Sequence, residues 1–441
     1  MMQGIRITRI IIILFLFTKG AAAQQVITLE EAVGAALNSN FDILLVKNDV
    51  DAAGVDKFYA FGNFVPAVNA TAGLTQTISA QEQEFDTRPK SAGSGIRTVN
   101  INGAINLNWT VFDGFRMFAV KDRLNQQYDL ANINLKNQVI NTTAEVINAY
   151  YIIVRQKQRL KAIEEQMSIN EERVKLADRK LSVGLGTKPE LLQAKVDLNA
   201  QKAAHLQHRT VMTQSKDQLN QLTGMKLPAI YDVLDSIPIN ASLNIEDMLA
   251  GIENTNLTIL QSLKTLDISE TMLREAKGAL WPSVSLVTAY NFTRNNNYNN
   301  INPYAPLYNM NRGLNFGVTA TVPILNFMNV RRSIRQAQID IHYNNINVTK
   351  QKNVINVAVK VGYYDYQYQL SALQLEEENI ELAKENVYIA MERFKLGAST
   401  FLELREAQKS LEDAYDRLIA ARYNTKVAET ELLRLKGELV R

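Results

Sequence analysis

The 441-residue sequence contains no cysteine, and both proline (9) and glycine (20) are sparse. The absence of cysteine excludes a disulfide framework and a cysteine-borne lipid anchor. Sparse glycine and proline are unlike a compact α/β enzyme, in which turns recur frequently. Beyond residue 23, no apolar run approaches the roughly 18 residues of a membrane-spanning helix. These absences disfavour a disulfide-rich domain, a compact enzyme and a helical membrane protein.

The chain also lacks a dominant charge and the usual motifs of nucleotide or metal chemistry. Its 48 basic and 45 acidic residues give a formal charge of +3, which does not support nucleic-acid binding. There is no GxxxxGK[ST] loop and no recognisable nucleophile–base set. His205 and His208 are spaced i, i+3 on a helix, but no third metal ligand lies nearby. We therefore expect no enzymatic activity, no cofactor, no metal and no nucleic-acid partner.

The first 23 residues have the pattern of a secretory signal peptide. Arg6 and Arg9 precede the short apolar segment IIIILFLF, and three alanines before Gln24 fit a small-residue cleavage site. Removal of this segment takes away three basic residues and no acidic one, so the mature chain is formally neutral. We predict a signal peptide over residues 1–23 and an exported mature protein.

Two long segments, residues 116–183 and 328–396, contain no proline and only one glycine, Gly362. As helices they would each be roughly 100 Å long, too long for one globular core. Each contains a seam with the 3.5-residue spacing that is typical of coiled coils. The seams are Leu160, Ile163, Met167, Asn170, Val174, Ala177 and Leu181, and, 213 residues later, Leu373, Glu376, Ile380, Ala383, Val387, Ala390 and Phe394.

The same offset aligns KLSVGLGTKPELLQAKVDL (180–198) with RFKLGASTFLELREAQKSL (393–411), which predicts an internal duplication. The first repeat covers residues 24–223, a connector covers 224–244, and the second repeat covers 245–441. In each repeat we expect a first helix, two strands, the long helix and a return helix of about 35 residues. The first helices are predicted over residues 29–60 and 245–280.

The strands alternate polar and apolar residues, as in VNINGAINLNW (99–109). Their polar sides are uncharged and include Asn100, Asn102, Asn106, Asn108, Asn315 and Thr319. Their apolar sides carry Trp109, Phe112, Tyr290, Phe292 and Phe316. Alternating strands of about ten residues with terminal aromatics are typical of outer-membrane barrels, with the polar side in the lumen and the apolar side in lipid. The alternative, a small soluble sheet packed on the helices, explains one such strand better than four.

The predicted strands are residues 68–78, 99–109, 284–293 and 314–322, and we expect long external loops over 79–97 and 294–313. Four strands cannot close, because barrels begin at about 8 strands and open edges are not tolerated in lipid. The chain must therefore be an oligomer. Two copies would give a filled barrel that conducts nothing, so three copies are favoured.

These features resemble the TolC-type outer-membrane efflux proteins over essentially the whole mature chain. The resemblance is carried by ITLEEAVGAALNSN, NFVPAV, ALWPSV, VFDGFRM, VGLGTKPELL and LGASTFLEL. It implies a mostly α-helical α+β membrane protein. Three copies would form a 12-stranded outer-membrane β-barrel, four strands per protomer, continuous with an α-helical barrel in the periplasm. The implied partners are a periplasmic adaptor protein and an inner-membrane RND or ABC-type transporter.

The turns between the long and return helices are the predicted adaptor-docking tips: Gly184, Leu185, Gly186, Thr187, Gly397, Ala398, Ser399 and Thr400. The resemblance places Glu403 and Glu406, with Glu190 in the first repeat, at the periplasmic aperture. Acids that complement the helix dipole are the alternative. Family members often have Asp at the positions of Glu403 and Glu406 and a basic residue at that of Ser399. Closure is therefore expected to depend on other contacts here.

The sequence thus predicts a passive exit duct in the outer membrane of a Gram-negative bacterium. It would belong to a tripartite efflux or type I secretion system, with a substrate that the sequence does not identify. The alternative is a structural coiled-coil tether of the envelope without channel activity. A tether would not need strands lined with asparagine.

Overall fold

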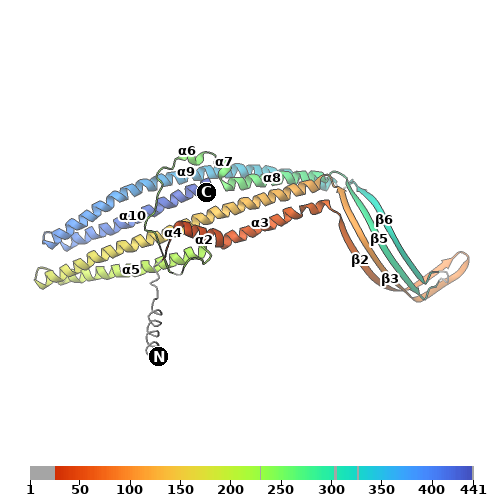
Figure 1. Ribbon diagram of the computed structural model, residues 1–441, viewed down its shortest axis with the longest axis horizontal. Helices are drawn as coiled ribbons and strands as arrows, with labels where there is room; N and C mark the ends of the chain where they lie inside the picture. The colour runs from red at the N-terminus through yellow and green to blue at the C-terminus, as the bar shows by residue number, and fades with distance from the viewer. Residues whose placement is uncertain (1–24, 229, 302–304, 325–326, 440–441) are drawn as a thin grey trace, which may run out of the picture. The chain divides into compact units, whose positions relative to one another are not determined.

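The computed structural model describes residues 25–228, 230–301, 305–324 and 327–439 (Figure 1). The predicted signal peptide, residues 1–23, lies outside this range. The chain forms two compact units. Of the described residues, those in 25–48, 133–260 and 351–439 form one unit, and those in 49–132 and 261–350 form the other.

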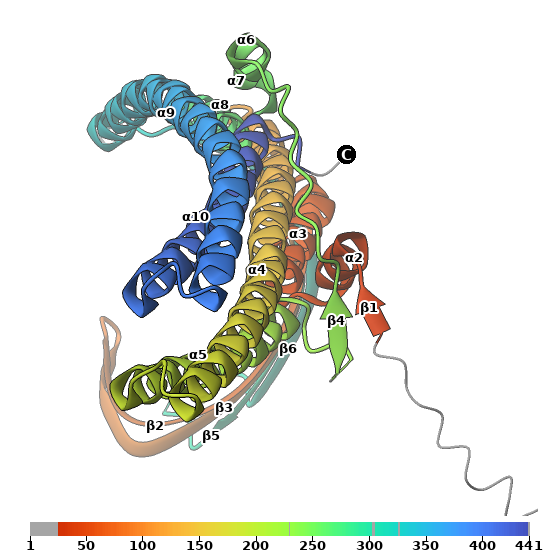
Figure 2. The same ribbon diagram turned by 90° about the vertical axis from the view of Figure 1, so that its left-hand side faces the viewer.

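Two helical hairpins contain the four longest helices. The first joins α4 (Arg116–Ser182) to α5 (Lys188–Leu222), and the second joins α9 (Phe327–Lys395) to α10 (Phe401–Lys436). Figure 2 shows the two arms of each hairpin side by side. The structure confirms both long helices and both return helices, because few residues in these segments can interrupt a helix. None of the described helices is long and apolar enough to cross a membrane.

The seam of the second hairpin forms a continuous hydrophobic core. Every member of the predicted α9 seam except Glu376 belongs to it, together with Leu404, Leu411 and Leu418 of α10. Glu376 forms an ion pair with Arg417 of α10, with 2.9 Å between Oε1 and Nε. The one charge in the seam therefore has a partner across the hairpin.

The predicted first helices are each broken, so their prediction as single helices was wrong. The first consists of α2 (Leu29–Ser39) and α3 (Phe41–Tyr59), and the second of α6 (Ile245–Leu249), α7 (Ile252–Thr255) and α8 (Leu257–Gly278). A capping box between Thr28 and Glu31 stabilises the start of α2.

Asparagine is the physical reason for the break before α3 and α8. The Asn40 Oδ1 accepts hydrogen bonds from the backbone N–H groups of Asp42 and Ile43, and its Nδ2 donates to the carbonyl of Leu222 at 2.8 Å. Asn256 caps α8 in the same way and donates to the carbonyl of Leu435 at 2.7 Å. Each asparagine thus provides hydrogen-bond partners for backbone N–H groups at the start of one helix and for a backbone carbonyl at the end of a return helix.

A four-stranded antiparallel sheet has the order β2-β3-β5-β6. Its strands are β2 (Ala67–Phe85), which follows the 3-10 helix η1 (Ala60–Phe64), β3 (Arg88–Phe112), β5 (Ser283–Tyr298) and β6 (Tyr308–Thr321). The predicted loops over 79–97 and 294–313 were wrong. β2 and β3 pair up to a two-residue turn, and β5 and β6 occupy most of the second range. Polar residues do not end a strand whose backbone still has an antiparallel partner.

A second, two-stranded sheet pairs β1 (Gln25–Ile27) in parallel with β4 (Tyr231–Val233). β4 belongs to the segment between α5 and α6, which we call the connector (residues 224–244). The connector therefore has an ordered element of its own, joined to the start of the described chain.

Candidate channel surface, helical tips and connector

The polar sides of the four strands lie on one face of the sheet. Directly paired residues of antiparallel strands point to the same face, and Asn69, Asn106, Ala289 and Asn315 form one such row. The register therefore brings all the predicted lumen residues together: Asn100, Asn102, Asn106, Asn108, Asn315 and Thr319. We call this surface the amide face.

The amide face is neutral and internally hydrogen-bonded. Asn100 Nδ2 donates to Asn295 Oδ1, and Thr98 Oγ1 donates to Asn297 Oδ1 at 3.1 Å. From β2 through β6, the amide face over residues 67–79, 98–110, 283–297 and 309–321 contains no Asp, Glu, Lys or Arg. Such a surface can hold water and passing solutes without selecting for charge.

The opposite face is apolar and uncovered in the single chain. Trp109, Tyr290, Phe292 and Phe316 lie on it, as predicted. Phe316 is 82% exposed. A contiguous exposed apolar surface of this kind indicates contact with lipid or another protein.

Phe112 reaches the apolar face only through a β-bulge. Strict alternation would place it opposite Trp109, because the two residues are an odd number of positions apart. The register shifts between Thr110 and Phe112, so that Phe112 pairs with Val284, which shares a face with Leu286. A bulge of this kind redirects a side chain at the end of a strand.

The joint between β3 and α4 is closely packed. The Asp113 carboxylate accepts a hydrogen bond from the backbone N–H of Met117 at 2.9 Å and so caps the first turn of α4. Gly114 has a φ of +74°, and a Cβ at this position would lie 2.1 Å from the carbonyl oxygen of Gly278. The VFDGFRM motif is thus explained by a turn that only glycine can make here.

At the tips, the two long helices end in the left-handed conformation at Gly184 (φ +76°) and Gly397 (φ +74°). Both turns have the backbone hydrogen bonds of a Schellman motif. Thr187 forms a capping box with Glu190, and the Thr400 side chain accepts a hydrogen bond from the backbone N–H of Glu403. Local helix capping therefore explains part of the tip sequence without reference to a partner.

The other tip residues are largely open to solvent. Leu185 is 81% exposed, and Gly184, Gly397, Ala398 and Glu406 are also exposed. Ser399 Oγ donates to the Glu403 carboxylate at 2.6 Å, so the serine side chain contacts the first turn of α10. Glu190 lies at the start of α5, whereas Glu403 and Glu406 lie in the first two turns of α10.

Behind the tips lies a buried ionic cluster that the sequence analysis missed. Arg173 of α4 is 1% exposed and donates from Nη2 to Asp197 of α5 and from Nη1 to Gln408 of α10, both at 2.6 Å. Its guanidinium also lies 5.2 Å from the ring centroid of Phe401. Burial lowers the pKa of Arg173, and the Asp197 carboxylate opposes that shift. The sequence signal that could have pointed to this region is Asn170, a polar residue in the predicted seam one helical turn before Arg173, which the structure buries.

A lysine adds a second contact between the hairpins. Lys180 Nζ of α4 donates to the Phe394 carbonyl of α9 at 2.5 Å and lies 3.8 Å from the centroid of the Phe394 ring. Together with the Arg173 cluster, this contact joins the first hairpin to the second on the tip side. The expectation that other contacts replace a basic residue at Ser399 is consistent with these bonds.

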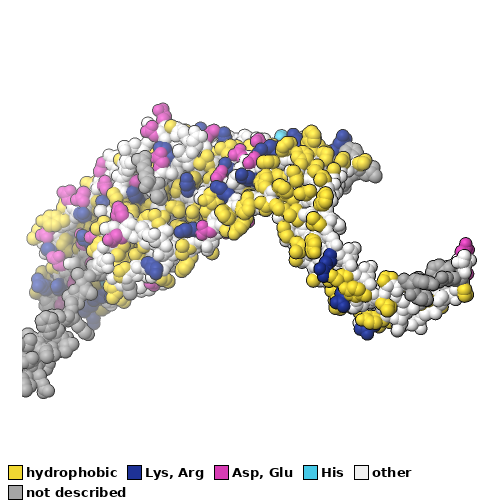
Figure 3. Space-filling view, turned by 45° about the vertical axis from the view of Figure 1, so that its right-hand side comes forward, with side chains coloured by type: hydrophobic (Ala, Val, Ile, Leu, Met, Phe, Trp, Pro, Cys, Tyr) yellow, Lys and Arg dark blue, Asp and Glu magenta, His cyan; other side chains and the backbone are white. Residues whose placement is uncertain are grey.

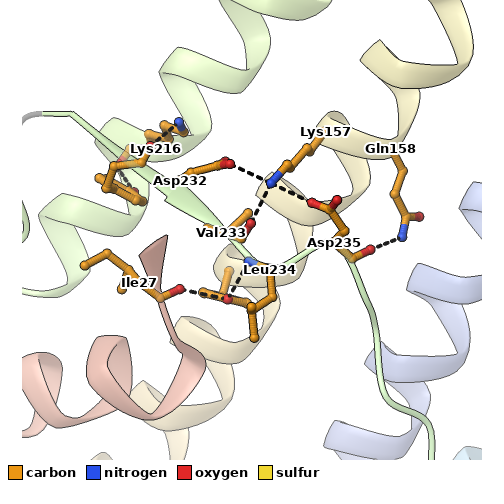
Figure 4. Close-up of polar contacts among 10 residues, drawn as sticks. Ile27, Lys157, Gln158, Lys216, Asp232, Val233, Leu234 and Asp235 are labelled. Carbon is orange, nitrogen blue, oxygen red and sulfur yellow. Dashed lines mark hydrogen bonds and ion pairs between the residues drawn. The ribbon is translucent and has the colours of Figure 1, made fainter. Parts of the chain in front are cut away.

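The connector is attached to α4 by Lys157 (Figure 4). Lys157 Nζ lies 2.6 Å from the carboxylate of Asp232 and 2.5 Å from that of Asp235, and it donates to the Val233 carbonyl at 2.7 Å. Gln158 adds a hydrogen bond to the Asp235 carbonyl at 2.7 Å. One lysine thus binds three polar groups within residues 232–235 of the connector.

Burial and hydrogen bonding shift the pKa values of Asp232 and Lys157 in opposite directions. Burial by itself raises the pKa of Asp232, but the hydrogen bond from Lys157 and the nearby positive charges outweigh it, so the pKa lies below its usual value. For Lys157, burial lowers the pKa, and the bonds to Asp232 and Asp235 outweigh it to give a raised value. Both groups are therefore charged at neutral pH.

The two histidines on α5 contact other residues rather than each other. His205 Nε2 lies 3.3 Å from Glu164, and His208 Nδ1 lies 3.0 Å from Gln156. Burial, followed by the charges of Arg159 and Arg155, lowers the pKa of His208. Within the described residues there is no group of three or more His, Cys, Asp or Glu side chains that could hold a metal ion.

An antiparallel sheet with one amide face and one exposed apolar face, continued by coiled-coil hairpins, defines the class of outer-membrane channel proteins. Known proteins agree with this assignment. The profile of the outer membrane efflux protein family matches residues 32–225 and again residues 252–438. The chain belongs to this family.

Individual relatives have low sequence identity to this chain, but the alignments cover two thirds of it or more. The toluene efflux pump outer membrane protein TtgC of Pseudomonas putida is 23% identical over 423 residues, covering 93% of this chain and 82% of TtgC. The outer membrane protein TolC of Vibrio cholerae is 23% identical over 304 residues, 67% of each chain. Among solved structures, the outer-membrane channel OprN superimposes with a TM-score of 0.78 at 18% identity, covering 93% of this chain and 90% of OprN. The protein is thus an outer-membrane efflux channel of a Gram-negative bacterium, and the channel extends into the periplasm.

Proposed function

We propose that this protein is the passive exit duct of a tripartite efflux or type I secretion system. In this proposal, three copies form one water-filled channel, and substrates enter it from a periplasmic adaptor and an inner-membrane RND or ABC-type transporter. The chain supplies the path and its gated end, and the partner supplies the energy. Membership of a family of outer membrane channels, which are not enzymes, supports this role.

One observation carries the proposal: a single sheet has an uncharged amide face, an apolar face and two open edges. β2 and β6 are the edges of the sheet, and neither has a second neighbour among the described strands. An open edge is not tolerated in lipid, so further copies must pair with it. Three copies give twelve strands, enough for an open lumen, whereas two give a filled barrel.

The same proposal assigns roles along the chain. Residues 24–223 and 245–441 would be two copies of one ancestral unit, separated by the connector. The repeated order of two strands, a long helix and a return helix supports this origin. The barrels of strands and of helices would be continuous, because α4 begins directly after β3.

At the periplasmic end, the exposed tips around Gly184 and Gly397 would dock the adaptor. Glu190, Glu403 and Glu406 would line the aperture, where three copies of each carboxylate would repel one another and favour cations. The exposure of Leu185 and of Glu406 supports an interaction with something other than the tip itself.

The absence of cysteine makes a direct test possible. Asn315 and Phe316 are neighbours on β6 that lie on opposite faces. In planar bilayers we expect the wild-type protein to conduct. A membrane-impermeant thiol reagent should reduce the conductance of the Asn315→Cys variant and leave the conductance of the Phe316→Cys variant unchanged.

Two outcomes would contradict the proposal. A purified protein that never conducts would favour the structural coiled-coil tether. Equal modification of Asn315→Cys and Phe316→Cys would show that the apolar face is in water and not in lipid. Native mass spectrometry of the same preparation tests the number of copies.

A further inference from the structure

Three arginines lie on the mainly apolar face of the sheet: Arg97 of β3, Arg294 of β5 and Arg312 of β6. Arg312 pairs with Phe292 and Arg294 pairs with Ile101, which places both on the apolar face. Arg97 pairs with Tyr298 and lies on the same face further along. Figure 3 shows Lys and Arg side chains among hydrophobic ones over part of the sheet.

The arginines occupy one end of the face. Counted from Val284 beside the helices, Arg312 pairs eight residues along β5 and Arg294 lies ten residues along it. At about 3.4 Å per residue and a tilt of roughly 45°, these positions are about 19–24 Å above Val284. The apolar band of an outer-membrane barrel is about 25 Å high, so both guanidinium groups lie at its outer boundary. Arg97 lies beyond it.

None of the three arginines has a carboxylate partner in the described part of the chain. Arg97 donates to the Gln76 side chain at 2.9 Å and Arg294 to Asn296 at 3.4 Å. All three are exposed. In contrast, Lys90, beyond Arg97 on β3, forms an ion pair with Glu82 of β2. The three positive charges therefore remain available to an external anion.

Aromatic rings hold these arginines along the sheet. The guanidinium carbon of Arg97 lies 5.6 Å from the ring centroid of Tyr298, that of Arg294 5.3 Å from Tyr308, and that of Arg312 5.8 Å from Phe292. Arg294 and Arg312 are diagonal neighbours, so their backbones are about 7–8 Å apart. One phosphate group can accept hydrogen bonds from both, because guanidinium groups match phosphate oxygens in pairs.

We propose that Arg97, Arg294 and Arg312 form a binding site for the phosphorylated headgroup of an outer-leaflet glycolipid of the lipid A type. The acyl chains of that lipid contact the exposed Leu314 and Phe316 on the same face. The site is on the lipid side, because all three arginines lie on the apolar face, opposite the amide face. This inference rests on the proposed barrel and names the lipid to which its outer surface binds.

The headgroup, and not free phosphate, is the proposed occupant. A lipid phosphate is delivered to the outer boundary of the apolar band, where charge is tolerated, and its chains add apolar contact. Free phosphate gains nothing from the apolar residues below the arginines. Millimolar inorganic phosphate should therefore fail to displace the lipid.

The test uses the full-length trimer in mixed micelles with increasing diphosphoryl lipid A, and native mass spectrometry counts the bound lipid. Each arginine should contribute about fivefold to affinity, which corresponds to about 1 kcal/mol. The triple variant R97Q/R294Q/R312Q should therefore bind about 100 times more weakly than wild type. A control variant that removes three exposed positive charges on α5, K195Q/K202Q/R209Q, should bind as wild type does.

Lipid A without phosphate groups should bind weakly to both wild type and the triple variant. Equal binding of diphosphoryl lipid A by wild type and the triple variant would overturn the inference, as would displacement of the lipid by inorganic phosphate. Bilayer conductance separates this failure from that of the proposed function. A triple variant that conducts but binds like wild type refutes only the lipid site, whereas a wild-type protein that does not conduct refutes the barrel.

Discussion

Arg173 offers a sharp test of how the two hairpins are held together. The variant Arg173→Met keeps most of the apolar stem but removes the guanidinium that bonds to Asp197 and Gln408. Gln408 is 5% exposed, and its Nε2 already has no hydrogen-bond partner. The variant therefore leaves the whole Gln408 amide buried without a partner.

The size of the effect follows from what remains. Asp197 keeps Arg405, 3.3 Å from its carboxylate, and Gln193, which donates to it at 2.8 Å, so its charge is still compensated. The main cost is the unpaired amide of Gln408, about 1–3 kcal/mol. Loss of the buried guanidinium also removes its desolvation penalty. We expect local stability near the tips to fall by about 2 kcal/mol.

Hydrogen–deuterium exchange of the trimer in detergent measures this local stability without requiring global unfolding. A loss of about 2 kcal/mol corresponds to roughly 30-fold faster exchange of amides in residues 188–200 and 401–411. The double variant R173M/Q408L should restore most of the protection, because replacing both partners with apolar groups is nearly neutral.

The matched control is Arg179→Met, which removes an exposed arginine from the same helix. Equal exchange in R173M and R179M would refute the assigned role of the cluster. So would a double variant that is less protected than R173M, because the unpaired Gln408 amide would then not be the cause.

Three further predictions concern the aperture, the connector and the docking tips. The double variant E403A/E406A should lower the cation preference of the channel in bilayers, because it removes carboxylates at the aperture; unchanged selectivity would place these residues elsewhere. Lys157→Met should speed amide exchange of the connector about tenfold, because it leaves Asp232 without its charged donor. In wild type, this protection should persist between about pH 5 and pH 9. It should begin to fall only when the pH drops below the ordinary Asp pKa of about 4, and be lost below the lowered pKa of Asp232. On the alkaline side it should begin to fall only above the ordinary Lys pKa of about 10.4, and be lost above the raised pKa of Lys157. A loss near pH 7 would contradict the ion pair. Leu185→Glu should abolish efflux in cells while trimers remain in the membrane, and survival of efflux would remove this tip from the docking surface.

Matched variants serve as controls for the predictions on the aperture and the connector. Glu378→Ala with Glu385→Ala removes two exposed acids of α9 away from the tip and should leave ion selectivity unchanged. Lys161→Met, one turn from Lys157 on α4, removes an exposed lysine and should leave connector exchange unchanged.

Much of the fold was predictable because its signals are local. The lengths of α4 and α9 follow from segments with no proline and a single glycine, and the turns at Gly184 and Gly397 follow from a residue that suits a left-handed helix end. The two faces of each strand follow from alternation alone, since side chains in a strand point to opposite sides in turn. The sequence by itself therefore determined the long helices, the reversals and the polarity of each strand.

The tertiary structure decided where distant segments meet. The break at Asn40 depends on the carbonyl of Leu222, 182 residues away, and no local pattern identifies that partner. The face of Phe112 depends on a bulge that only the pairing of β3 with β5 reveals. The Arg173 cluster likewise draws its members from three helices. These features are set by which backbones and side chains come within hydrogen-bonding distance, and that is a property of the packed chain.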